Sequence, residues 1–208
     1  MYSRVQYISQ GATTDAQLRN IQSVLDAGYS WVQLRFKNQE EHVLLKVAAQ
    51  VKNLCDQYHA TFIMNDHVHL AKAVDASGVH LGLTDMGIAS ARNILGNEKI
   101  IGGTANTLQD VRQRIAEGCN YIGLGPYRFT KTKEKLSPIL GLEGYERIMN
   151  ALSAEEKAVP IYAIGGIEQN DIELLRNTGV YSIAASGLLT QQYIPQNLSL
   201  HTSSMIAS

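Results

Sequence analysis

Short apolar segments alternate with helix-like segments eight times along this chain, and this alternation constrains its fold more than any other feature. Most of the apolar segments are nearly continuous in apolar residues, which is typical of strands covered on both faces. The predicted strands occupy residues 5–9, 31–35, 61–64, 79–81, 99–102, 121–124, 161–164 and 181–185.

The segments between these predicted strands carry apolar residues three and four positions apart, as one face of a helix does. Val43, Leu44 and Val47 show this spacing after the second strand, Thr13 is a capping candidate before the first helix, and Gly118 is a plausible stop after the fifth. Regular alternation predicts parallel strands joined by right-handed crossovers. Eight units predict an α/β fold closed into a (βα)8 TIM barrel, small at about 26 residues per unit.

The chain shows no linker and no change of composition that would divide it. With 208 residues, 45% of them apolar, it is long enough for a single domain spanning 1–208. The polar tail at 191–208, which contains Pro195, is the least predictable part.

Charge and cysteine usage restrict the partners and the compartment. Eighteen basic and nineteen acidic residues give a net charge of −1, which argues against nucleic acid or an anionic membrane as a partner. The chain begins without a secretion-like apolar run and contains no apolar stretch long enough to span a membrane. Cys55 and Cys119 are predicted to be buried thiols. We expect a cytoplasmic protein; a homo-oligomer is left open.

In a barrel of this kind, function lies at the carboxyl ends of the strands. The second strand ends in a polar cluster whose alternate residues Gln33, Arg35 and Lys37 share one face, with Leu34 and Phe36 on the other. Two cations at a barrel mouth indicate a phosphate or diphosphate ligand. The alternative is an internal ion pair with a barrel carboxylate.

Two carboxylates follow the third and fourth strands. Asp66 comes directly after the third, and Asp85 follows the fourth through a short turn. One or two carboxylates beside a phosphate are typical of a Mg²⁺ site. Helix capping by the same two residues is the competing interpretation.

The later strand ends indicate a second anion site. The sixth strand is followed by a long connection to Gly141 in which hydroxyls and ammonium groups alternate, although a solvated charged loop would have the same composition. Gly165 and Gly166 follow the seventh strand, where a backbone can approach a ligand closely. The residues alone therefore indicate a barrel with two anion sites and a carboxylate pair, without naming a substrate.

The chain closely resembles the thiamine-phosphate synthase family over residues 4–190. Five segments carry the resemblance, at 33–37, 64–66, 78–82 with Asp85, 125–133 and 163–167. The resemblance implies a Mg²⁺-dependent transferase of thiamine biosynthesis that joins a pyrimidine diphosphate to a thiazole phosphate.

The resemblance also implies a role for each matched position. The Mg²⁺ ligands would be Asp66 and Asp85. The pyrimidine diphosphate would be held by Gln33, Arg35, Lys37, Asn65, Thr104 and Lys133, of which Arg35, Lys37 and Lys133 would also stabilise the leaving diphosphate. The thiazole phosphate would be held by Thr130, Thr132, Gly166, Ala185 and Ser186.

The chain departs from the family pattern at several of these strand ends. His67 stands where arginine is usual, and Leu83 where glutamine is usual. Gly103, Thr104 and Asn106 replace the common valine, serine and histidine, although Thr104 keeps a hydroxyl.

Three other functions stay open at this point. A thiazole tautomerase on the same barrel would need a histidine in the loop after the sixth strand, where this chain has Gly125 and Pro126. A non-catalytic barrel that binds thiamine precursors would explain the changes at His67 and Leu83. Other phosphate-handling barrels, such as sugar-phosphate epimerases, lack the threonine–lysine pattern of the long loop. His80, inside the fourth strand, is predicted to have a hydrogen-bonded core role.

Overall fold

The computed structural model describes residues 2–129 and 138–190 of the chain. Its eight strands form one closed barrel in chain order, every neighbouring pair is parallel, and β1 pairs with β8 to close it. This confirms the predicted (βα)8 barrel. The strands are β1 (Val5–Ile8), β2 (Trp31–Leu34), β3 (Thr61–Asn65), β4 (Gly78–Leu81), β5 (Ile100–Ala105), β6 (Tyr121–Leu124), β7 (Ile161–Ile164) and β8 (Ser182–Ala185).

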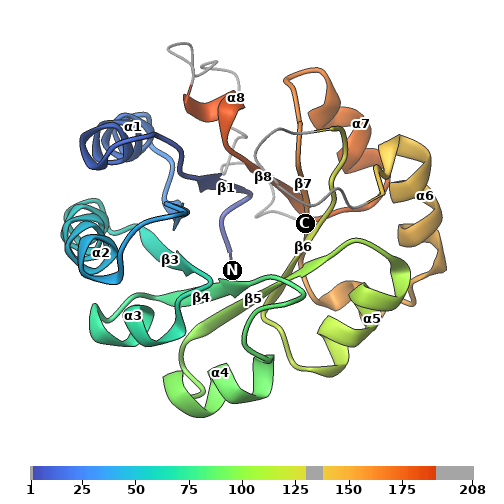
Figure 1. The fold of residues 1–208 in the computed structure, drawn as a ribbon. Coiled ribbons are helices and arrows are strands. Elements are labelled where there is room, and N and C mark those ends of the chain that lie inside the picture. The colour runs from blue at the N-terminus through green and yellow to red at the C-terminus, as the bar shows by residue number, and fades with distance from the viewer. Residues whose placement is uncertain (1, 130–137, 191–208) are drawn as a thin grey trace, which may run out of the picture.

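Helices surround the barrel, and Figure 1 shows them as an outer ring around the strands. Thr13 caps the first helix through a bond from the Ala16 amide to its hydroxyl, as predicted. The helices are α1 (Thr14–Asp26), α2 (Glu41–Gln57), α3 (Val68–Ala73), α4 (Ile88–Leu95), α5 (Leu108–Ala116), α6 (Gly141–Ala151), α7 (Asp171–Asn177) and α8 (Gly187–Thr190), with a 3-10 turn η1 (Glu156–Ala158) before β7. Within the described ranges, no helix is long and apolar enough to cross a membrane.

The fifth strand differs from its prediction. It continues to Ala105 rather than ending at residue 102, so Thr104 lies inside the strand. A Cβ on Gly102 would lie 2.2 Å from Cζ of Tyr121, and one on Gly103 would lie 2.7 Å from Cδ of Arg114. The two glycines therefore make room for neighbouring side chains instead of ending the strand.

The barrel interior is filled at its amino-terminal end by aromatic rings. The Trp31 and Tyr121 ring centroids are 4.9 Å apart, and those of Trp31 and Tyr162 are 5.1 Å apart. All three side chains are buried, and Tyr2 stacks on Trp31 from below. This aromatic floor, made of Trp31, Tyr121 and Tyr162, closes one end of the barrel, so the open space lies toward the carboxyl ends of the strands.

The outer core lies between the barrel and the helices. Both cysteines are part of it: Cys55 and Cys119 are buried and unpaired with each other, as predicted. Burial raises the pKa of each thiol to about 12, so neither is a reactive thiolate at neutral pH.

Candidate active site

A cavity of about 870 Å³ opens at the carboxyl ends of the strands. Each of the eight strands contributes to its lining, through residues that include Ile8, Gln33, Asn65, His80, Thr104, Gly123, Ile164 and Ala184. The cavity therefore lies where function is expected in a barrel of this kind.

A pair of carboxylates lies at the edge of this cavity. Asp66 follows β3 with a left-handed backbone (φ 63°), and its amide donates to the carbonyl of His80 at 2.9 Å. Oδ2 of Asp85 accepts a hydrogen bond from the amide of Gly82 at 2.6 Å. These backbone bonds hold the two carboxylates within hydrogen-bonding reach of each other.

The carboxylate pair disfavours charge on Asp66. Burial, and after it the neighbouring Asp85, raise the pKa of Asp66 to about 6 against the opposing effect of Lys37 and Arg35. Two negative groups this close need a cation or a shared proton.

Helix capping does not account for either aspartate. The cap position of α3 is His67 and that of α4 is Gly87, and neither helix has a side-chain cap bond. The competing interpretation from the sequence is therefore wrong for both residues.

The cationic cluster after β2 lies beside this pair. Nζ of Lys37 is 3.8 Å from Oδ2 of Asp66, a long ion pair with a half-exposed lysine, so the predicted alternative of an internal pair holds in a weak form. Arg35 is anchored through its amide, which donates to Oγ of Ser9 at 2.9 Å. Gln33 donates from Nε2 to Oδ1 of Asn65 at 2.8 Å, and both side chains are buried.

The strict alternation predicted for this segment is wrong at one position. Strand β2 ends at Leu34, and beyond it Phe36 lines the cavity together with Arg35 and Lys37. The chain leaves regular strand geometry there, so period-two alternation no longer applies.

A chain of polar groups crosses the cavity just above the aromatic floor. Nε2 of Gln6 donates to the Tyr121 hydroxyl at 3.0 Å, this hydroxyl lies 3.0 Å from Nδ1 of His80, and Nε2 of His80 lies 3.0 Å from Oγ1 of Thr104. The predicted hydrogen-bonded core role of His80 is confirmed. It also orients Thr104, one of the predicted substrate contacts.

The opposite side of the cavity is shaped by backbone. Gly165 and Gly166 have left-handed φ values of 87° and 71°. A Cβ on Gly166 would lie 2.8 Å from Cβ of Arg128, so the loops after β6 and β7 approach closely. Arg128 binds both carboxylate oxygens of Asp171 and donates to the Gly166 carbonyl at 3.1 Å, which fixes the two loops together.

The predicted site residues within the described ranges meet at this one cavity. Those that line it are Gln33, Arg35, Lys37, Asn65, Asp66, Asp85, Thr104, Gly166, Ala185 and Ser186. Thr130, Thr132 and Lys133 lie outside the described residues. Of the two departures singled out as functionally relevant, Leu83 lines the cavity with 44% of its surface exposed, whereas His67 is exposed and does not line it.

Sequence reasoning missed the contribution of the first βα unit. Gln6 of β1, Ser9 and Gln10 directly after it, and Gln17 of α1 line the cavity, and the hydroxyl of Ser186 donates to Oε1 of Gln10 at 3.3 Å. The polar residues directly after the first apolar segment are the signal that could have revealed Ser9 and Gln10.

Comparison with known proteins agrees with this geometry. The family profile described as thiamine monophosphate synthase matches residues 6–189. A thiamine-phosphate synthase of Flavobacterium psychrophilum is 55% identical over 95% of this chain and 96% of its own length, and one of Phocaeicola vulgatus is 44% identical over 92% of both chains. A solved thiamine phosphate pyrophosphorylase from Pyrococcus furiosus has a TM-score of 0.76 and 28% identity, covering 88% of this chain and 85% of that one.

Proposed function

The chain belongs to the thiamine monophosphate synthase family, and we propose that it joins 4-amino-2-methyl-5-(diphosphooxymethyl)pyrimidine to a thiazole phosphate, yielding thiamine phosphate and diphosphate. Family membership makes it a transferase of thiamine biosynthesis. The observation that supports this particular reaction is the carboxylate pair of Asp66 and Asp85, which lies beside the cations Arg35 and Lys37 at one cavity edge.

Mg²⁺ fits this donor set. Asp85 raises the pKa of the neighbouring Asp66, so the pair attracts a cation, and Mg²⁺ accepts one or two carboxylates while keeping water and phosphate oxygens as its other ligands. Asp66 and Asp85 would hold the ion, and a bound Mg²⁺ would neutralise charge on the leaving diphosphate. Within the described residues no cluster of three metal-binding side chains exists, which is consistent with an ion that shares its shell with substrate.

The protein's own groups bind and orient the pyrimidine diphosphate. Arg35 and Lys37 would contact the diphosphate, together with Lys133. Gln33 and Asn65 are fixed by their mutual hydrogen bond, and Thr104, held by His80 just above the aromatic floor, would face the pyrimidine. Groups fixed before the substrate arrives need no reorganisation during the reaction.

The thiazole phosphate would occupy the opposite side. Gly166, Ala185 and Ser186 would surround its phosphate, with Thr130 and Thr132 as further contacts. The bond between the pyrimidine methylene carbon and the diphosphate oxygen breaks, its electron pair leaves with the diphosphate, and the thiazole nitrogen bonds to that carbon. The aminopyrimidine delocalises the developing cation, so the protein supplies positioning and charge rather than a nucleophile.

The tautomerase alternative has no support in the cavity. Of the described residues that line it, the one histidine is His80, and both of its ring nitrogens have partners in the protein. The loop after β6 begins with Gly125 and Pro126, where a tautomerase would need its histidine.

The test mixes purified protein with both substrates, with and without Mg²⁺, and follows thiamine phosphate and diphosphate together. Equal amounts of both products that depend on Mg²⁺ are expected. Diphosphate binding without any product would instead identify a non-catalytic precursor-binding barrel, and Leu83→Gln would then be the first reversion to make.

A further inference from the structure

Arg114, on the outer side of the barrel, makes a three-way connection beneath the cavity edge. It projects from α5, is 4% exposed, and pairs through Nη1 with Oε2 of Glu117 at 2.7 Å. Its Nη2 donates to the carbonyl of Gly82 at 2.9 Å, and its Nε donates to the carbonyl of Thr104 at 3.1 Å.

The two carbonyls belong to neighbouring strand ends that both carry predicted site residues. The parallel register pairs Leu81 of β4 with Gly103 of β5, so the next residues are Gly82, directly after β4, and Thr104, near the end of β5. Arg114 therefore joins these strand ends just where their ladder stops.

Gly82 is held on both sides. Its carbonyl accepts from Arg114, and its amide donates to Asp85 at 2.6 Å. Asp85 in turn lies within hydrogen-bonding reach of Asp66. A displacement of Gly82 would therefore move one carboxylate relative to the other.

Gly103 leaves space for the side chain of Arg114. A Cβ on Gly103 would lie 2.7 Å from Cδ of Arg114, so the absence of a side chain there lets the arginine lie against the strand. A planar guanidinium donates in three divergent directions at once, which a lysine ammonium on a flexible stem cannot reproduce.

We propose that Arg114 is a positioning residue for the carboxylate pair: by fixing Gly82 and Thr104 it holds Asp85 beside Asp66 at the geometry a divalent cation requires. This inference rests on the proposed function. It assigns the residue no contact with substrate; its effect reaches the cavity through Gly82.

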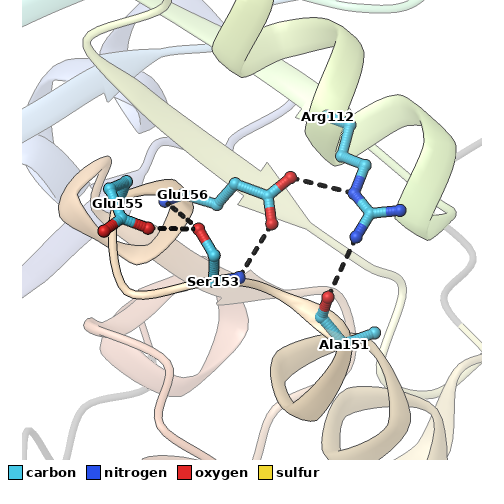
Figure 2. A network of polar contacts seen from close by, with 5 residues as sticks. All are labelled: Arg112, Ala151, Ser153, Glu155 and Glu156. Carbon is cyan, nitrogen blue, oxygen red and sulfur yellow. Dashed lines mark hydrogen bonds and ion pairs between the residues drawn. The ribbon is translucent and has the colours of Figure 1, made fainter.

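The same helix offers a matched control. Arg112 also donates to a glutamate and to a carbonyl, namely Oε1 of Glu156 and the oxygen of Ala151, both at 2.9 Å. Figure 2 shows that this network, completed by Ser153 and Glu155, joins α5 to the turn after α6. Its members do not line the cavity, so Arg112 has a comparable structural role without the connection to Asp85.

The experiment compares wild type, Arg114→Lys and Arg112→Lys as full-length proteins. Product formation at saturating substrates is titrated with Mg²⁺, and binding of Mn²⁺ alone is followed by electron paramagnetic resonance. Because supporting residues around a metal site typically change its affinity by about 10–100-fold, Arg114→Lys should raise the half-saturating concentration of both ions about tenfold. Arg112→Lys should leave both within about twofold, although each variant lowers the melting temperature.

Two results would overturn the proposal: an unchanged ion response in Arg114→Lys, or an equal shift in Arg112→Lys. If Arg114→Lys does not fold, Gly103→Ala tests the same point, because its added methyl group displaces the Arg114 side chain while keeping its charge. Gly103→Ala should raise the half-saturating concentrations of both ions several-fold. An unchanged ion response in this variant would refute the proposal. A wild type indifferent to chelation of divalent ions would refute the proposed function as well, whereas a Mg²⁺-dependent wild type with an unshifted Arg114→Lys refutes this inference alone.

Discussion

The cavity edge contributed by β2 to β4 and the edge contributed by β6 to β8 handle charge in opposite ways. In the first, here called the early rim, Asp66 faces another carboxylate, and the nearby cations Lys37 and Arg35 compensate it only in part. In the second, the late rim, the carboxylate of Asp171 is 4% exposed and already bound by both terminal nitrogens of Arg128. The late rim then presents mainly backbone to the cavity, through Gly165 and Gly166.

Under the proposed function, this difference means that one scaffold prepares its two anion sites in two ways. The early rim would keep its charges incompletely matched until the proposed metal and diphosphate bind, which favours binding at the expense of stability. The late rim satisfies its charges internally and relies on the shape of a glycine turn. Substitutions should therefore affect function and stability differently on the two sides.

The largest effect is expected from Asp66→Asn on turnover. Losing one of two carboxylates should lower the Mg²⁺-dependent rate roughly a hundredfold or more, since the metal contributes several kcal/mol to stabilising the transition state. Steady-state formation of thiamine phosphate measures it. Asp75→Asn is the control, because Asp75 is an exposed partner of Lys99 away from the cavity; near-normal rates in Asp66→Asn would remove the metal assignment from the early rim.

Gly166→Ala tests whether the late rim depends on backbone shape. Its left-handed φ and the 2.8 Å approach of Arg128 should together force the turn outward and raise the KM for thiazole phosphate about tenfold, with a smaller change in kcat. Gly28→Ala separates the two causes, since Gly28 has φ 89° but nothing within 4 Å of an added Cβ. If Gly166→Ala lost as much stability as Gly28→Ala but kept its KM, the backbone shape at Gly166 would not matter for function.

Asp171→Asn should destabilise the protein by about 1–2 kcal/mol at pH 7, because it removes a buried partner of a half-exposed arginine. Burial alone would raise the pKa of Asp171, but bonds from Arg128 and from the amide of Glu168 hold it below its ordinary value of 3.8. Because the pKa is lowered on folding, the ionised carboxylate stabilises the fold at pH values above 3.8. This stabilisation is lost as the pH falls through the lowered pKa of the folded protein. Urea unfolding should therefore show a constant deficit from pH 5 to 8; a deficit that varied in this window would contradict the ion pair.

The smallest effect has the opposite sign. The pKa of Asp66 rises from 3.8 to about 6 on folding, so the folded protein binds the proton more tightly and wild-type stability falls as pH rises through that interval. The carboxylate is 27% exposed, which reduces the full value of the shift, so metal-free Asp66→Asn should be about 1 kcal/mol more stable than wild type at pH 8 and equal to it near pH 4. Thermal melts in a chelator at both pH values measure this difference. If Asp66→Asn were less stable than wild type at pH 8, the charge of Asp66 would not be destabilising, and the contrast drawn between the two rims would be wrong.

The fold was largely predictable because each strand is marked by a short apolar segment of its own sequence. The strands at 121–124 and 161–164 coincide with their apolar segments. The fifth strand was not predicted in full, since its glycines look like a strand end until Tyr121 and Arg114 are seen to occupy their space.

The site was predictable where strand ends carry charge and unpredictable where support comes from far along the chain. Asp66 and Asp85 could be grouped because consecutive parallel strands end at one edge of the barrel. The bond between Ser186 and Gln10 joins residues 176 positions apart, and no local spacing signals it. Arg114 was missed for a different reason: a lone arginine in a helical pattern looks like a solvent-exposed residue.

The aromatic floor formed by Trp31, Tyr121 and Tyr162 has a kinetic consequence. Among the described residues this floor closes the base of the cavity, so in the proposed reaction both reactants would enter and both products would leave at the carboxyl ends of the strands. In the proposed reaction the pyrimidine ring would lie deepest, against Thr104, so it would have to bind before the thiazole phosphate. The thiamine phosphate formed there would have to leave before the next pyrimidine enters. An excess of the thiazole compound would then bind near the cavity mouth before the pyrimidine enters and would slow turnover, which follows from the closed floor together with this order of binding.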